Sequence, residues 1–178
     1  MTTQTSYREW LRQDLNVLID VLNISDLQKH FLKSRWLGQV LWMEEKAAIA
    51  QVWYYILRLV AIVGGIIVPV LVSLTMSGQA NELLLKGSTT VLSLLVAISV
   101  AVEEFLRFGE RWRHYRRTVE MLKIEGWQFF QFSGPYRDYK THADSYSEFA
   151  GRIENVTMQE VDVYITQVVK EKKEEEKK

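Results

Sequence analysis

An uninterrupted apolar stretch, Leu59–Met76, constrains the fold of this chain more than any other feature. Its 18 residues (LVAIVGGIIVPVLVSLTM) carry no charge. At a rise of about 1.5 Å per residue they span roughly 27 Å as a helix, close to the ~30 Å hydrocarbon core of a bilayer. The alternative is a helix buried in a soluble core, but such a helix usually keeps one polar face. We therefore expect this segment to cross a membrane.

A second, weaker apolar stretch follows at Gly87–Val102 and spans roughly 24 Å by the same rise. The link between the two stretches, Ser77–Lys86, is short, and Gly78 and Asn81 favour a turn within it. A short link requires two antiparallel neighbouring helices. The sequence thus predicts a transmembrane hairpin within residues 52–107, with spans at about 59–76 and 87–106.

Basic residues predict the orientation of the hairpin. The link holds only Lys86, whereas Arg58 precedes the first span and five arginines follow the second within Arg107–Arg117. The positive-inside rule therefore places both flanks, and both termini, in the cytoplasm. Aromatic residues typical of a membrane interface fall on the same side: Trp53, Tyr54, Tyr55, Phe105, Phe108 and Trp112.

Small residues recur at a spacing of four in both stretches. They are Ala61, Gly65, Pro69 and Ser73 in the first and Thr89, Ser93, Ala97 and Ala101 in the second. Small residues allow membrane helices to approach closely, so we expect these stripes to pack the hairpin or to join protomers. A second interpretation is that the hydroxyls of Thr89, Ser93 and Ser99 line a water-filled pore.

Two acidic residues, Glu103 and Glu104, lie at the cytoplasmic end of the second span. Charges are costly at the centre of a bilayer and are expected at its boundary. Arg58 and Arg107 provide interfacial ion-pair partners, Arg107 because it follows Glu103 by four residues. One interpretation is mutual neutralisation. The other is a ring of Glu103 or Glu104 at the inner mouth of a cation path, with Glu103 the pore candidate below Ser99 and Glu104 the partner of Arg58.

The run Arg107–Arg117 is both basic and aromatic. Such a composition can bind single-stranded nucleic acid, but a position directly after a membrane span favours anionic lipid headgroups. We therefore expect no nucleic-acid partner. The headgroup candidates are Arg111, Arg113, Arg116 and Arg117.

The flanks predict cytoplasmic helices over residues 1–51 and 108–170. Ser6 with Glu9 and Ser25 with Gln28 resemble capping boxes, the first opening a helix with a leucine face. That face comprises Leu11, Leu15, Leu18 and Leu22.

After the second span, a helix is expected from Glu103 to about Phe132, weakened at Gly126 and followed by a turn at Ser133–Tyr136. A last helix over about 143–169 carries an apolar stripe of Phe149, Ile153 and Val156, which needs the N-terminal helices or another subunit as partner. Residues 171–178 are expected to be a disordered charged tail.

The composition argues against catalysis. The chain has no cysteine and three isolated histidines, so it offers no disulfide, no thiolate ligand and no metal-ligand spacing. We therefore expect no catalytic residue, no metal and no cofactor. The polar N-terminus, MTTQTSYREW, does not resemble a signal peptide.

Three segments carry a resemblance to a known family: Arg35-Trp36-Leu37, Trp42-Met43-Glu44 and the long run Arg107–Tyr136. Over roughly residues 30–170 the chain resembles a bacterial two-transmembrane family of unknown function, of the SLATT-type membrane effector domains. The resemblance implies a two-helix membrane unit in the bacterial inner membrane and a pore-forming role, and it implies no catalytic residues.

The sequence thus predicts an all-α membrane protein, a homo-oligomer with a two-helix hairpin and cytoplasmic helical extensions. Because two helices cannot enclose a water path, several subunits are needed for the expected function, a pore or cation channel. The alternative is a membrane-anchored interaction module that does not conduct.

Overall fold

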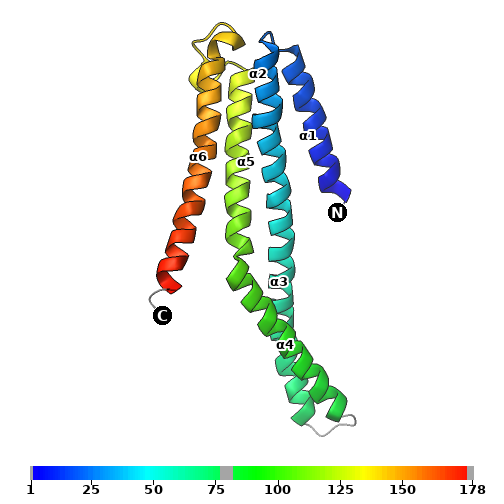
Figure 1. Cartoon of the computed structure of the whole chain (residues 1–178). Coiled ribbons are helices and arrows are strands. Elements are labelled where there is room, and N and C mark those ends of the chain that lie inside the picture. The colour runs from blue at the N-terminus through cyan, green and yellow to red at the C-terminus, as the bar shows by residue number, and fades with distance from the viewer. Residues whose placement is uncertain (1, 77–81, 176–178) are drawn as a thin grey trace. The chain divides into compact units, whose positions relative to one another are not determined.

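The computed structural model describes residues 2–76 and 82–175, and these residues form helices joined by short turns, with no strand among them. In chain order they are α1 (Thr2–Val21), α2 (Asp26–Phe31), a π-helix (Leu32–Leu37), α3 (Gly38–Met76), α4 (Glu82–Leu106), α5 (Phe108–Phe130), a 3₁₀-helix (Gly134–Tyr136) and α6 (His142–Glu175) (Figure 1). The predicted all-α fold is confirmed. The turn predicted at Gly78 and Asn81 lies outside the described residues.

The chain divides into two units. The first, here called the helical unit, combines Met1–Glu45 with Tyr115–Lys178, and the second, the hairpin unit, is Lys46–His114. Helices α3 and α5 each contribute residues to both units.

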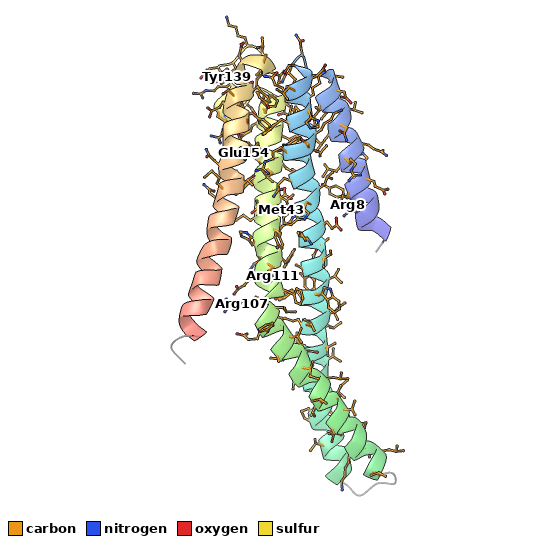
Figure 2. The ribbon with its side chains drawn as sticks, viewed as in Figure 1. Arg8, Met43, Arg107, Arg111, Tyr139 and Glu154 are labelled. Carbon is orange, nitrogen blue, oxygen red and sulfur yellow. The ribbon has the colours of Figure 1, made fainter. Side chains whose placement is uncertain are left out.

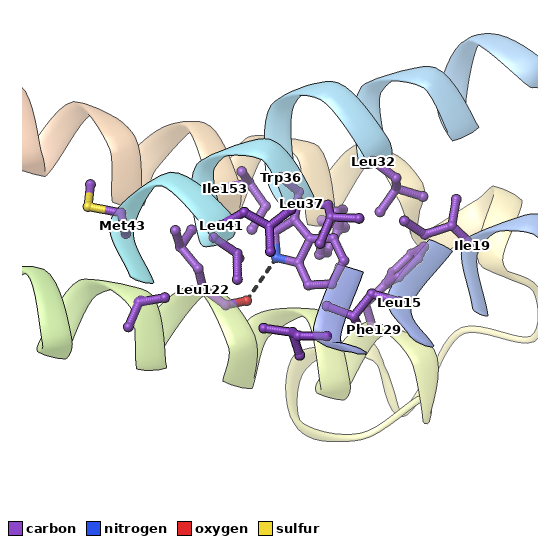
Figure 3. Packing of buried hydrophobic residues seen from close by; sticks show 14 of the residues in the cluster. Leu15, Ile19, Leu32, Trp36, Leu37, Leu41, Met43, Leu122, Phe129 and Ile153 are labelled. Carbon is purple, nitrogen blue, oxygen red and sulfur yellow. Dashed lines mark hydrogen bonds between the residues drawn. The ribbon is translucent and has the colours of Figure 1, made fainter. Parts of the chain in front are cut away.

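The core of the helical unit is built around Trp36. Its indole is 1 % exposed and its Nε1 donates a hydrogen bond of 2.9 Å to the carbonyl oxygen of Leu122 (Figure 3). A Cβ on Gly126 would lie 2.0 Å from Cζ2 of Trp36, so a glycine in α5 is what admits the ring. Buried partners come from every long helix of the unit: Leu11, Leu15, Ile19, Leu32, Val40, Leu122, Phe129, Phe149 and Ile153.

Of the two capping boxes predicted in the N-terminal region, the structure contains one. The capping box at α2 is confirmed, because the Gln28 amide donates to Ser25 Oγ (3.3 Å) and the Ser25 amide donates to Gln28 Oε1 (2.9 Å). The capping box predicted at Ser6 and Glu9 is wrong, because α1 already begins at Thr2. The leucine face of α1 is confirmed: Leu11 and Leu15 are buried in the core.

Helix α6 carries the predicted apolar stripe, and its partner lies within the same chain. Phe149 and Ile153 are fully buried in the core of the helical unit, and Val156 packs against it. The helix extends to Glu175, so residues 171–175 are helical where the charged composition predicted a disordered tail. Residues 176–178 lie outside the described residues.

The helix expected over Glu103–Phe132 is interrupted. Arg107 adopts a φ of 48°, in the left-handed region, and separates α4 from α5. Gly126, the predicted weak point, lies inside the uninterrupted α5. The predicted turn is confirmed as a 3₁₀-helix at Gly134–Tyr136, preceded by Phe132 with a φ of 49°.

In the hairpin unit, α3 and α4 pack along a seam with alternating spacings of three and four residues. Buried or half-buried positions on α3 are Tyr54, Leu57, Ala61, Gly64, Val68 and Leu71. Those on α4 include Leu85, Thr89, Leu92, Val96, Ser99 and Glu103. This mean spacing of about 3.5 is the knobs-into-holes pattern of closely aligned helices.

Candidate functional site

Helix α4 presents a face of small and polar side chains that no part of the hairpin unit covers. At 100° per residue these side chains share one side of the helix, and all are exposed: Lys86, Thr90, Ser93, Ala97, Ala101 and Glu104. The face between this strip and the seam carries large apolar residues, namely Val91, Leu94, Leu95, Ile98 and Phe105. The helix therefore has three distinct faces: the seam, an apolar face and this small polar face.

The predicted pore residues separate between those faces. Ser93 and Glu104 lie on the small polar face, whereas Ser99 is 8 % exposed and lies on the seam together with the half-buried Glu103. Ser99 and Glu103 therefore share a face, which in a single hairpin is the seam with α3, and their role at a pore in an oligomer stays a prediction. Thr89 is half-buried and its hydroxyl donates to the Leu85 carbonyl (2.8 Å).

The predicted packing stripe also needs correction. A Cβ on Gly64 would lie 2.2 Å from Cγ2 of Val96, whereas a Cβ on Gly65 would meet nothing within 4 Å. Gly64, not Gly65, is therefore the glycine of close approach within the hairpin. Pro69, Ala97 and Ala101 are exposed and Ala61 is half-buried, so a strict spacing of four departs from the seam after the first turn. The alternative role of the exposed stripe, joining protomers, stays a prediction.

The end of α4 gathers charge. Arg58, Glu103, Glu104 and Arg107 all line a hollow of about 250 Å³. Arg107 does not form the predicted ion pair with Glu103, because its left-handed φ takes it out of the helix. Its Nη1 lies 3.8 Å from Oε2 of Glu110 instead, and Arg58 lies over the Tyr54 ring at 5.9 Å. Figure 2 shows Arg107 at the junction of α4 and α5.

The aromatic residues predicted at the membrane interface form contacts in the hairpin unit. Tyr54 and Trp112 stack with their ring centroids 6.0 Å apart, and Trp53 and Phe108 stack at 6.3 Å. Sequence reasoning missed Gly109 in this group. A Cβ there would lie 2.7 Å from Cε2 of Tyr54, so the glycine admits the tyrosine ring next to the start of α5.

The four arginines predicted to contact lipid headgroups lie in α5. Arg111, Arg113 and Arg117 are exposed. Arg116 is exposed as well, and its guanidinium lies 2.8 Å from Oε1 of Glu120 and 3.3 Å from Oε2 of Glu44. The headgroup role of all four arginines stays a prediction.

Two charge clusters stabilise the helical unit from within. In the first, the Lys123 ammonium donates to Glu44. Burial lowers the pKa of Lys123, but the hydrogen bond and the charges of Glu44 and Glu120 outweigh that effect and raise it overall. Neither cluster forms a metal site: in the part of the chain that the structure describes, no group of three or more His, Asp or Glu side chains is arranged to hold an ion.

The second cluster centres on Glu125, which is 7 % exposed. The Tyr136 hydroxyl donates to it, and Arg152 donates through Nε (2.5 Å) and Nη2 (3.1 Å). Burial and the hydrogen bond to Glu125 raise the pKa of Tyr136 well above its ordinary value. Sequence reasoning missed this triad, whose members are far apart along the chain.

Comparison with known proteins assigns the chain to a family whose function is unknown. The sequence profile of a family described as "Protein of unknown function (DUF4231)" matches residues 38–144. No curated protein and no solved structure matches the chain. The matched region contains the apolar part of α3, all of α4 and α5, and Gly109 and Gly126. The chain belongs to this family of unknown function, DUF4231.

Proposed function

We propose that this chain is a two-pass membrane protein whose hairpin unit assembles with further copies of itself around an ion path. The observation that carries the proposal is the division of α4 into a seam, a large apolar face and a small polar face. Small side chains on the third face allow a further helix to approach closely.

Membrane insertion is supported by the exposure of apolar side chains. Two helical stretches, Asp26–Leu74 and Leu83–Leu106, are long and apolar enough to cross a bilayer, and 6 % of the most apolar 18-residue window of each is buried. Leu59 (63 %) and Ile66 (66 %) are typical of the exposed residues. Exposed apolar surface costs about 25 cal/mol per Å² in water, whereas lipid solvates it. The core helix of a soluble protein would instead be mostly buried.

The orientation proposed for the hairpin places both termini in the cytoplasm. Arg58 and the exposed arginines of α5 lie beyond the cytoplasmic ends of the two spans, whereas Lys86 is the basic residue near the opposite ends. This asymmetry follows the positive-inside rule. The stacked aromatic rings at Tyr54 and Trp112 suit the same interface.

Assembly is supported by the chemistry of the small polar face. Ser93, Ala97 and Ala101 allow another helix to approach closely. Glu104 extends the same face at the end of the span, at the membrane boundary where a charged group is expected. In a ring of copies this face meets a neighbour or lines the central path, and Glu104 then forms an acidic ring that attracts cations at the inner mouth. The resemblance to SLATT-type membrane effectors supports a pore in a bacterial inner membrane.

Ion flux into liposomes containing the purified protein tests the conducting role. We expect flux from the wild type, and a reduced preference for cations over anions in Glu104→Gln. Glu103→Gln is the matched control, because this neighbouring carboxylate lies on the seam. Absence of flux in every salt tested, with wild type and both variants equal to empty liposomes, would discard the pore.

A second candidate function is a membrane-anchored interaction module. It is favoured by exposed apolar side chains on the helical unit, such as Trp10 (55 %) and Ile124 (55 %). Chemical crosslinking in membranes separates the two functions. A ladder of homo-oligomers supports the pore, whereas monomers crosslinked to a different protein support the module.

A further inference from the structure

The charged hollow at the end of α4 has an unusual balance of groups. Three guanidinium groups and three carboxylates line its volume of about 250 Å³: Arg58, Arg107, Arg113, Glu103, Glu104 and Glu110. The formal charges cancel. Of these six, Arg107 and Glu110 are the one pair within 4.0 Å in the described part of the chain, at 3.8 Å. The hollow thus holds separated positive and negative groups rather than a closed set of ion pairs.

The backbone and the aromatic residues hold this arrangement open. Arg107 is in the left-handed region (φ 48°), which costs an ordinary residue about 1–2 kcal/mol and separates α4 from α5. Tyr54 fills the gap at Gly109, where an added Cβ would lie 2.7 Å from its ring. The Arg58 guanidinium rests over the same ring at 5.9 Å. The Arg58 guanidinium is therefore positioned by an aromatic ring, whereas Arg107 lies 3.8 Å from the Glu110 carboxylate.

A second hollow of about 270 Å³, with a mixed polar and apolar lining, adjoins the charged one. The two share Arg58, Glu103 and Glu104, and the second extends over Leu57, Ala61, Ile62 and Val100. The polarity of the lining therefore falls from the end of the hairpin towards its middle.

We propose that these joined hollows bind one zwitterionic phospholipid of the phosphatidylethanolamine type. Its phosphate accepts hydrogen bonds from Arg58, Arg107 and Arg113, and its ammonium donates to Glu103 and Glu104. The upper part of an acyl chain lies along Leu57, Ala61 and Ile62. The inference rests on the proposed membrane insertion but is independent of conduction.

The charge balance distinguishes this lipid from the alternatives. An anionic lipid without an ammonium group could contact the three guanidinium groups but would give Glu103 and Glu104 no cationic partner. A free headgroup such as phosphoethanolamine would satisfy the charged groups but leave the second hollow empty. A zwitterion with an acyl chain satisfies both halves of the site.

Native mass spectrometry of the full-length protein released from nanodiscs tests the inference. The nanodiscs contain equal amounts of phosphatidylethanolamine and phosphatidylglycerol. We expect retained phosphatidylethanolamine to exceed phosphatidylglycerol about fivefold, the scale of one charge-assisted contact. Glu103→Gln with Glu104→Gln should abolish this preference, and Arg58→Gln should reduce retention of both lipids. Added phosphoethanolamine should not displace the retained lipid.

Arg111→Gln is the matched control. Arg111 is exposed, two residues from Arg113, and lines neither hollow, so its removal should leave the retained lipids unchanged (Figure 2). If Arg58→Gln does not fold, Arg113→Gln replaces it. Incorporation into nanodiscs with no retained lipid, or with equal retention of the two lipids, would overturn the inference alone. Failure of the wild type to enter nanodiscs would overturn membrane insertion itself.

Discussion

Gly64 of α3 and Val96 of α4 are in direct contact, and no larger residue fits at Gly64 without movement. A Cβ built on Gly64 would lie 2.2 Å from Cγ2 of Val96 and 3.7 Å from Cδ1 of Leu92. This single approach sets the register of the seam, since the half-buried residues of both helices extend from it at alternating spacings of three and four.

Gly64→Ala should therefore destabilise the hairpin. Overpacking of this kind typically costs about 1–3 kcal/mol. Gly65→Ala is the control, because a Cβ there meets nothing within 4 Å. Denaturant unfolding in detergent, followed by circular dichroism, measures both. Val96→Ala in the Gly64→Ala background should restore part of the loss, and equal stability of the two single glycine variants would show that the seam is not as described.

In the helical unit, Gly126→Ala should also be destabilising, because Gly126 is in close contact with Trp36. A Cβ on Gly126 would lie 2.0 Å from Cζ2 of the buried Trp36, so Gly126→Ala should displace the indole and break its hydrogen bond to Leu122. Tryptophan fluorescence and the midpoint of thermal unfolding report the change, for which about 1–3 kcal/mol is expected.

Gly151→Ala is the matched control for that variant. Gly151 lies in α6, also within the helical unit, and a Cβ there meets nothing within 4 Å. Alanine should stabilise the helix by roughly 0.5–1 kcal/mol relative to glycine. A gain in stability from Gly126→Ala as well would contradict the packing of Trp36 against α5.

The sequence predicts some of these features and not others, for physical reasons. The span at Leu59–Met76 follows from its lack of charge, which is a local property. The seam does not follow, because a stripe at a strict spacing of four, such as Ser93, Ala97 and Ala101, drifts around a helix by about 40° per step. A strict spacing of four therefore selects Gly65, whereas the close approach within the hairpin is at Gly64.

Features that need a distant partner escape the sequence altogether. The sequence alone predicts that Gly126 weakens a helix, because its contact with Trp36 exists only in the folded chain. The helix break at Arg107 could not be predicted from the sequence, because the residue there is neither glycine nor proline. The Glu125 triad joins residues that only the folded helical unit brings together, whereas the capping box at Ser25 is local and was predicted correctly.

The buried Tyr136 hydroxyl predicts a pH dependence at high pH. Its pKa is raised above the ordinary 10.0 in the folded state by burial and by the hydrogen bond to Glu125. The folded protein thus retains this proton where the unfolded chain releases it. The contribution to stability is full below about pH 10 and is lost as the pH rises further.

Tyr136→Phe should remove that loss. Above pH 10 the free energy of unfolding of the wild type should fall more steeply than that of the variant, by up to about 1.4 kcal/mol per pH unit. At neutral pH the variant should be less stable by about 1.5–3 kcal/mol, because Glu125 loses a donor. Urea unfolding at a series of pH values measures both effects, and parallel curves above pH 10 would contradict the role given to the hydroxyl.

The central claim is that α3 and α4 carry the chain across a membrane and back, and the absence of cysteine makes it directly testable. Single cysteines at Ser77, in the link, and at Ser147, in α6, are treated in intact bacterial cells with a maleimide that does not cross the inner membrane. Ser77→Cys should react in intact cells, and Ser147→Cys only after the membrane is opened. Recovery of the protein in the soluble fraction without detergent, or equal labelling of both sites in intact cells, would contradict the account.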